Sequence, residues 1–176
     1  MSQEVYRRLA QRLDAIPNGF PATESGVELR LLAKMFTPEE AALAGVMRLT
    51  CEPSAEIAAR AGVHPDVARR TLKEMVRKGL IRAKREGGQL TFGLMPFIVG
   101  IYEAQLPRMD AELAALFEAY FQETRGGGIA STRPAIHRVI PVKEAIPFNL
   151  EVFPYERASE LLETARTINF SRLVEV

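Results

Sequence analysis

Cysteine and histidine are scarce in this chain of 176 residues, which contains one cysteine and two histidines. Cys51 has no second cysteine, so a disulfide framework and a cysteine-ligated zinc or iron–sulfur site are excluded within these residues. His64 and His137 stand far apart, and neither has another histidine or a cysteine at metal-ligand spacing. We therefore expect no metal and no cofactor, and we interpret Cys51 as a small buried hydrophobic residue.

Long apolar runs and catalytic motifs are also missing. The longest apolar run, Leu94 to Tyr102, is far shorter than the roughly 20 residues that a membrane span requires. The triplet Gly126-Gly127-Gly128 lacks the following lysine and Ser/Thr of a phosphate-binding loop, so we interpret it as a flexible hinge. Glu39 and Glu40 are neighbours, but charges in the first turn of a helix explain them better than a catalytic acid pair. The sequence predicts a protein that is not an enzyme.

The N-terminal residues have the pattern of an amphipathic helix. Apolar residues recur at helical spacing from Val5 to Ile16, with arginines between them. A secretion signal would instead carry a charged tip followed by an apolar block. This pattern favours a cytoplasmic protein without a membrane partner.

Two more helices are expected before residue 50. One covers about Glu28 to Phe36. In the other, Thr37 is the N-cap, Pro38 the first helical residue and Glu40 the capping-box glutamate, and the helix runs to about Leu49. Between Thr50 and Pro53 the sequence leaves a short strand and a loop equally open.

A helix-turn-helix pattern follows. The first helix has Ser54 as its expected N-cap, an inward stripe of Ile57, Ala58 and Ala61, and Gly62 at a left-handed C′ position. The second begins with Pro65, directly after His64, and ends at Gly79. Its inward stripe consists of Ala68, Leu72, Met75 and Val76. Its opposite face carries a stripe of four cations, Arg69, Arg70, Lys73 and Arg77.

A β-hairpin is expected next. A strand from Leu80 to Arg85 and a return strand from Gln89 to Leu94 flank Gly87-Gly88, the pair that a type I′ turn needs. A two-residue turn pairs Arg85 with Leu90, Ala83 with Phe92 and Ile81 with Leu94 on one mainly apolar face. Helix, turn, helix and hairpin together predict a winged helix within a mainly α, α+β fold.

Charge is concentrated on this unit. The whole chain has a formal charge of +1, yet residues 60–86 hold nine lysines and arginines against three aspartates and glutamates, a local charge of +6. The rest of the chain holds fourteen against nineteen, or −5. A basic patch on an acidic body is typical of a nucleic-acid-binding protein, and the alternative is an ordinary solvated helix face.

Two apolar helices are expected after the hairpin. The first starts at Pro96 and runs to Leu106, where Pro107 kinks or divides the segment, and the second carries an apolar stripe from Leu113 to Phe121. These helices either pack back on the winged helix or pair with the same helices of a second chain in a homodimer. We expect a winged-helix domain at residues 1–95, linking or dimerisation helices at 96–125 and a small appendage at 126–176. The appendage is predicted to have strands at 136–142 and 149–153 and a helix at 155–166.

The segment EIAARAGVHPDVARRTLKEMVRKGLI, Glu56 to Ile81, resembles the helix-turn-helix of MarR-like or TrmB-like winged-helix regulators. The resemblance implies that the second helix enters the major groove of double-stranded DNA with Arg69, Arg70 and Lys73, while Lys84 and Arg85 of the hairpin approach the backbone. The candidate DNA-binding residues are His64, Arg69, Arg70, Lys73, Arg77, Arg82, Lys84 and Arg85.

A second resemblance concerns the C-terminal part. HRVIPV (137–142) and PYERASELLETA (154–165) are similar to segments of ferredoxin-type iron–sulfur proteins, but no cluster-binding cysteines follow. This resemblance implies a shortened relative that lacks the cluster domain. Two hypotheses result: a DNA-binding transcription regulator, or a protein-interaction module that binds a partner in an iron–sulfur system.

Overall fold

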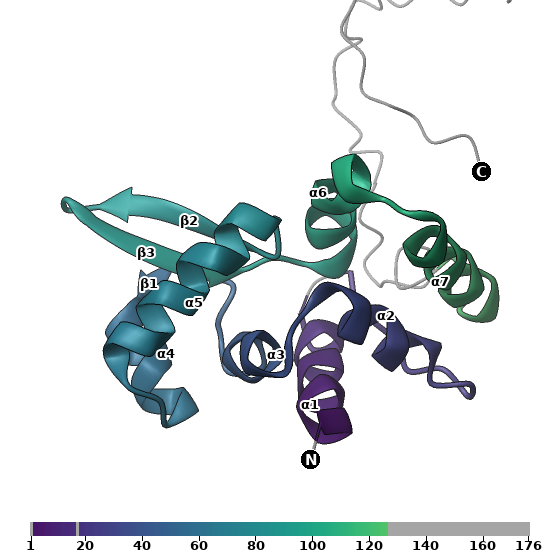
Figure 1. Cartoon of the computed structure of the whole chain (residues 1–176), viewed down its shortest axis with the longest axis horizontal. Coiled ribbons are helices and arrows are strands. Elements are labelled where there is room, and N and C mark those ends of the chain that lie inside the picture. The colour runs from purple at the N-terminus through teal and green to yellow at the C-terminus, as the bar shows by residue number, and fades with distance from the viewer. Residues whose placement is uncertain (1, 17, 127–176) are drawn as a thin grey trace, which may run out of the picture. The chain divides into compact units, whose positions relative to one another are not determined.

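The computed structural model describes residues 2–16 and 18–126, and the predicted strands and helix of the appendage lie outside this range. The described part is mainly helical and has one antiparallel three-stranded sheet with strand order β1-β3-β2 (Figure 1). This is the α+β fold class that the sequence predicts. None of the described helices is long and apolar enough to span a bilayer.

Three helices precede the sheet: α1 (Ser2–Asp14), α2 (Val27–Met35) and α3 (Pro38–Ala44). The predicted capping box is confirmed, because the Thr37 side chain accepts from the Glu40 amide and the Glu40 carboxylate accepts from the Thr37 amide. The prediction that α3 runs to about Leu49 is wrong. The chain leaves the helix after Ala44, and this departure allows the Arg48 carbonyl to accept a hydrogen bond from the Leu94 amide in the sheet.

The helix-turn-helix consists of α4 (Ser54–Ala61) and α5 (Pro65–Lys78). As predicted, Gly62 and Gly79 end these helices in the left-handed conformation, with φ of 67° and 73°. The expected N-cap of α4 is wrong by one residue. Pro53 occupies that position and makes no side-chain cap, because the proline ring carries no hydrogen-bond acceptor.

The hairpin is formed by β2 (Ile81–Glu86) and β3 (Gln89–Leu94). All the predicted pairs are present, including Arg85 with Leu90 and Ile81 with Leu94. The question left open at residues 50–53 is answered by β1 (Glu52–Pro53), which pairs with the free edge of β3 and places Glu52 opposite Phe92. The first strand thereby ties the start of α4 to the hairpin.

The segment after the hairpin differs from the single helix predicted for Pro96 to Leu106. The turn Phe97–Ile101 is interrupted by non-helical Ile98 and by Val99 at φ 61°, and regular helix begins only at α6 (Tyr102–Gln105). The Glu103 carboxylate stabilises the interruption, because it accepts hydrogen bonds from the Val99 and Gly100 amides at 2.9 and 2.6 Å. Pro107 lies in the short 3-10 turn Leu106–Arg108 and divides the segment as expected.

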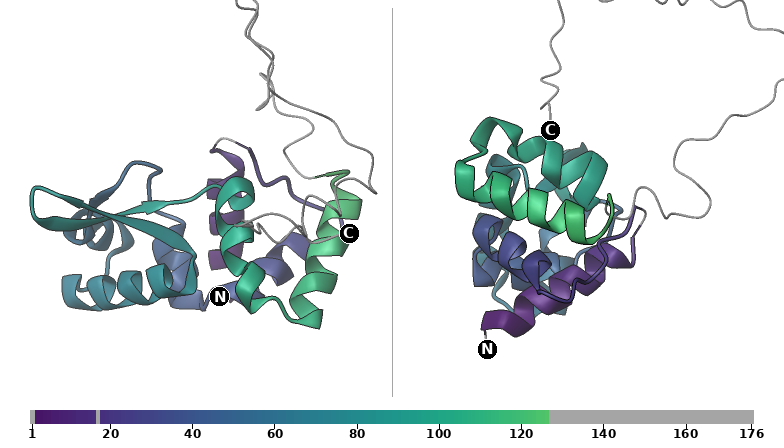
Figure 2. Two further views of the ribbon diagram at one scale, coloured as in Figure 1. Left: turned by 90° about the horizontal axis from the view of Figure 1, so that it is seen from above. Right: turned by 90° about the vertical axis from the view of Figure 1, so that its right-hand side faces the viewer.

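The last described helix, α7 (Ala111–Glu123), packs against α2 within the same chain (Figures 1 and 2). Phe20 lies between Phe97 and Tyr120, with ring centroids 4.3 and 4.8 Å away, and Phe117 packs against Phe97 at 5.7 Å. The apolar stripe that suggested a homodimer is therefore largely buried inside one chain. These helices thus pack back on the same chain, as one of the two alternatives predicts, and the homodimer stays a prediction.

Candidate nucleic-acid interface

Helix α5 is fixed at its N-terminal end by its own cap. The His64 Nδ1 atom accepts a hydrogen bond from the Asp66 amide at 3.3 Å. Pro65 is the first helical residue, and because proline has no N–H group, no amide is left without a partner at that position. The inward residues Ala68 and Leu72 are fully buried in the core shared with α4. The opposite face of α5 is thereby turned to solvent.

The predicted stripe of cations does gather on this outward face. An open surface depression is bordered by Asp66, Arg69, Arg70, Lys73 and Arg77. In the described part of the chain, Arg69, Arg70 and Lys73 make no ion pair or hydrogen bond, whereas Arg77 contacts Glu74 at 2.7 Å. We call Arg69, Arg70 and Lys73 the unpaired stripe. Three positive charges therefore lie on one exposed helix face, and none of them forms an ion pair with a carboxylate of the described residues.

The cations of the hairpin have different surroundings. Lys84 contacts Glu86 at 2.8 Å, and this hydrogen bond raises the pKa of Lys84 above its ordinary value. Arg85 is exposed at the end of β2. Arg82 is also exposed, but its guanidinium donates a hydrogen bond to the Leu49 carbonyl. The structure thus leaves Arg85 accessible, while Arg82 connects the hairpin to the loop before β1.

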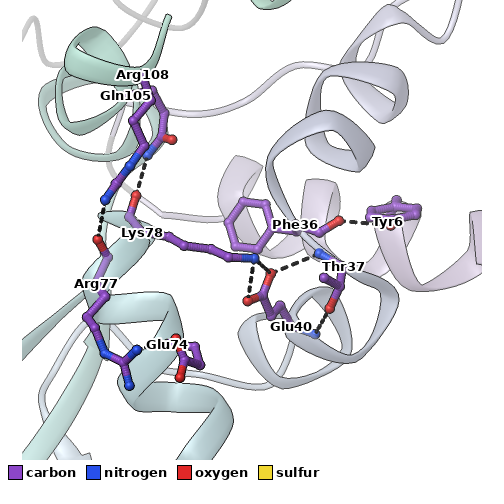
Figure 3. A network of polar contacts seen from close by, with 9 residues as sticks. All are labelled: Tyr6, Phe36, Thr37, Glu40, Glu74, Arg77, Lys78, Gln105 and Arg108. Carbon is purple, nitrogen blue, oxygen red and sulfur yellow. Dashed lines mark hydrogen bonds and ion pairs between the residues drawn. The ribbon is translucent and has the colours of Figure 1, made fainter.

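The C-terminal end of α5 is held on one side by α3. Lys78 Nζ lies 2.9 Å from one carboxylate oxygen of Glu40 and 3.0 Å from the other (Figure 3). The same carboxylate caps α3 through the Thr37 amide, and the neighbouring Tyr6 hydroxyl donates to the Phe36 carbonyl at 3.0 Å. Glu40 is only 4% exposed, so the ion pair is shielded on its acidic side.

The other side of this helix end is held by α6 and the turn that follows it. Gln105 Nε2 donates to the Lys78 carbonyl at 3.0 Å and Arg108 Nη2 donates to the Arg77 carbonyl at 2.6 Å (Figure 3). The packing is close, because a Cβ atom added at Gly79 would lie 2.8 Å from the Ala104 Cβ. These side chains satisfy carbonyls that have no partner within α5.

Gln105, Arg108 and Glu40 were not identified as orienting residues from the sequence. Gln105 and Arg108 lie 26 to 31 residues from the carbonyls they contact, and Glu40 lies 38 residues from Lys78. Their roles depend on tertiary packing, and no local spacing pattern could have shown them.

The site contains no candidate metal centre in the described residues, where no group of three or more metal-ligating side chains comes together. Cys51 is half-buried, not fully buried as expected. His137 lies outside the described residues.

No protein-family model and no curated protein sequence matches the chain. Among solved structures, the chain is similar to a MarR family transcriptional regulator from Streptomyces coelicolor, with 20% sequence identity and a TM-score of 0.30. The similarity covers 69% of this chain and 86% of that chain. None of these comparisons supports the ferredoxin-type resemblance of residues 137–142 and 154–165, which lie outside the described range.

Proposed function

We propose that this protein is a transcription regulator that binds double-stranded DNA with α5 in the major groove. The observation that carries the proposal is the unpaired stripe, Arg69, Arg70 and Lys73, on the solvent face of a helix whose other faces and both ends are held by the protein. Exposed cations without carboxylate partners attract a polyanion, since they need not first break internal ion pairs.

The dimensions of α5 suit this role. Its 14 residues correspond to a rod of about 21 Å. The major groove of B-DNA is about 12 Å wide and admits one α-helix. Contacts from His64 and Gln105 hold both ends of the helix, so its backbone is in place before DNA binds.

The proposal assigns different roles to the candidate residues. Arg69, Arg70 and Lys73 contact bases and phosphates in the groove, while His64 and Arg77 flank them along the same helix. The exposed hairpin residues Lys84 and Arg85 contact the backbone. Arg82 acts indirectly, because its hydrogen bond to the Leu49 carbonyl holds the hairpin in place.

Affinity for labelled duplex DNA, measured by fluorescence anisotropy over a series of salt concentrations, tests this function. The variant Arg70→Ala with Lys73→Ala should bind more weakly, and each lost phosphate contact should lower the slope of log K against log salt by about 0.9. Each lost base contact should cost about 1 to 3 kcal/mol.

The matched control is Arg7→Ala with Arg8→Ala, which removes the same charge from exposed positions on α1. It should retain nearly all of the affinity and the salt slope. Equal binding by the wild type and the Arg70/Lys73 double variant would refute the proposed function.

A further inference from the structure

The outward face of α5 also carries an apolar side chain that the core does not use. Within the described residues, the large hydrophobic side chains that remain exposed are Val63, Val67, Val99 and Phe121. Val67 is the one that belongs to α5, and it is 44% exposed, whereas its neighbour Ala68 is fully buried. Nearly half of this valine stays in water, so part of its apolar surface is available to a ligand.

Val67 lies beside Arg70, at the edge of the proposed DNA-binding face. It is the third residue of α5, and Arg70 follows three positions later, which places the two side chains on neighbouring parts of one helix face. Arg69 and Arg70 are both exposed and unpaired in the described part of the chain. An exposed valine beside Arg70 is thus positioned to meet a ligand that this arginine attracts.

The cations alone supply little sequence discrimination where they contact phosphates, because the backbone carries the same charge at every position. Thymine is the base that presents a methyl group in the major groove, and apolar side chains recognise it by direct contact. In helix-turn-helix proteins the first residues of the second helix are those that contact base edges. Val67 meets both requirements: it is apolar and it lies in the first turn of α5.

We propose that Val67 is a specificity-determining residue that contacts the C5-methyl group of thymine in the major groove. This inference rests on the proposed function and adds to it a preference for thymine at one position of each bound site. Removing one methyl group from the contact should lower affinity about fourfold, which corresponds to about 0.8 kcal/mol.

Competition between two duplex pools tests the inference. Both pools carry the same randomised segment, but one is synthesised with thymine and the other with uracil, which lacks the methyl group. The wild type should enrich the thymine pool about fourfold or more, and Val67→Ala should reduce this preference to near one. Alanine favours helix more than valine does, so this variant should fold.

The matched control is Val99→Ala, which shortens a valine that is 65% exposed and does not belong to α5. It should keep the preference for thymine. Equal binding of the two pools by the wild type, with salt-dependent affinity intact, would overturn the role of Val67 and leave the proposed function standing. A thymine preference that survives in Val67→Ala would also overturn it. Failure to bind either pool at low salt would refute both proposals.

Discussion

Cations in this protein occur in two kinds of surroundings. On the outward face of α5, Arg69, Arg70 and Lys73 have no carboxylate partner in residues 2–16 and 18–126. Behind and beside that helix, Arg60 and Lys78 each meet a carboxylate that is almost fully buried. Residue type alone therefore does not determine the role of a cation, because the position of the nearest acid decides it.

The paired cations connect neighbouring elements in one case and elements distant in sequence in the other. Arg60 of α4 contacts the Glu52 carboxylate of β1, with Nη1 at 2.8 Å, and Glu52 also accepts from the Arg48 amide at 3.2 Å. Lys78 connects α5 to α3 through Glu40. Such pairs orient the helix-turn-helix. The cations of the unpaired stripe make no such contact, so they are available to bind a ligand.

Charge reversal in the unpaired stripe should give the largest effect. Arg69→Glu with Lys73→Glu changes the charge of the outward face by four units, and repulsion from phosphates should lower DNA affinity at least a hundredfold, or about 2.7 kcal/mol. The thermal midpoint should hardly change, since neither side chain has a partner to lose.

The same charge change on exposed helix positions elsewhere, Arg7→Glu with Arg30→Glu, serves as its control for DNA affinity. A large loss of stability in the stripe variant, instead of a loss of binding, would show that the stripe stabilises the fold. The distinction between the unpaired stripe and the paired cations Arg60 and Lys78 would then be wrong.

Removal of the acid at β1 should give the next largest effect. Glu52→Ala leaves the Arg60 guanidinium and the Arg48 amide without their acceptor, and because Arg60 is partly exposed we expect a loss of about 2 kcal/mol in the free energy of unfolding. Chemical denaturation measures this loss. Glu56→Ala, at an exposed position on α4, is the matched control and should cost far less. Equal losses would mean that Glu52 does not anchor α4.

The sequence predicted the stripe of four cations on α5 and the hairpin because their signals are local, but it did not show that Arg77 is paired and the other three cations are not. Gly62, Pro65 and Gly79 mark the ends of helices through backbone geometry that depends on one or two residues. The hairpin register followed from the Gly87-Gly88 turn and side-chain alternation, and the pairing of Arg85 with Leu90 confirms it. Sites that depend on short-range chemistry can be predicted from one chain.

The interruption before α6, which was predicted wrongly, depends in part on a distant contact. Val99 lies in the left-handed region although it is a β-branched residue, and the Glu103 carboxylate and the Asn18 side chain, which donates to the Ile98 carbonyl at 2.6 Å, hold this turn. A helical pattern of apolar residues gave no sign of that break. The tether between Arg82 and Leu49 is likewise a consequence of the pairing of β1 with β3.

A third variant tests whether Gln105, which holds the C-terminal end of α5, influences DNA affinity only through the position of that helix. Gln105→Ala removes the donor to the Lys78 and Gly79 carbonyls, and we expect a loss of about 1 kcal/mol in the free energy of unfolding. DNA affinity should fall by less than tenfold, with the salt slope unchanged, because no phosphate contact is removed. Gln122→Ala, on the exposed side of α7, is the control for both measurements. A reduced salt slope would instead indicate that Gln105 or its surroundings contact DNA.

The smallest expected effect is that of pH on stability, which acts through the Glu123 carboxylate of α7. The Ser25 side chain and amide donate to Glu123 at 2.6 and 3.0 Å and hold the pKa of that carboxyl below its ordinary value. A lowered pKa in the folded state means that the unfolded chain binds more protons in acid. This contribution to stability is therefore present above about pH 4.5, the ordinary value, and is lost as the pH falls through the folded pKa.

Thermal midpoints measured between pH 7 and pH 3 test this link between α7 and the loop before α2. In Glu123→Gln the midpoint should fall less steeply in acid than in the wild type, because the group that titrates has been removed while an acceptor oxygen remains. Glu118→Gln removes a carboxylate whose hydrogen-bond partner in the described residues is Gln122 of the same helix, and it should leave the slope unchanged. Identical slopes for all three proteins would show that Glu123 does not hold α7 in place.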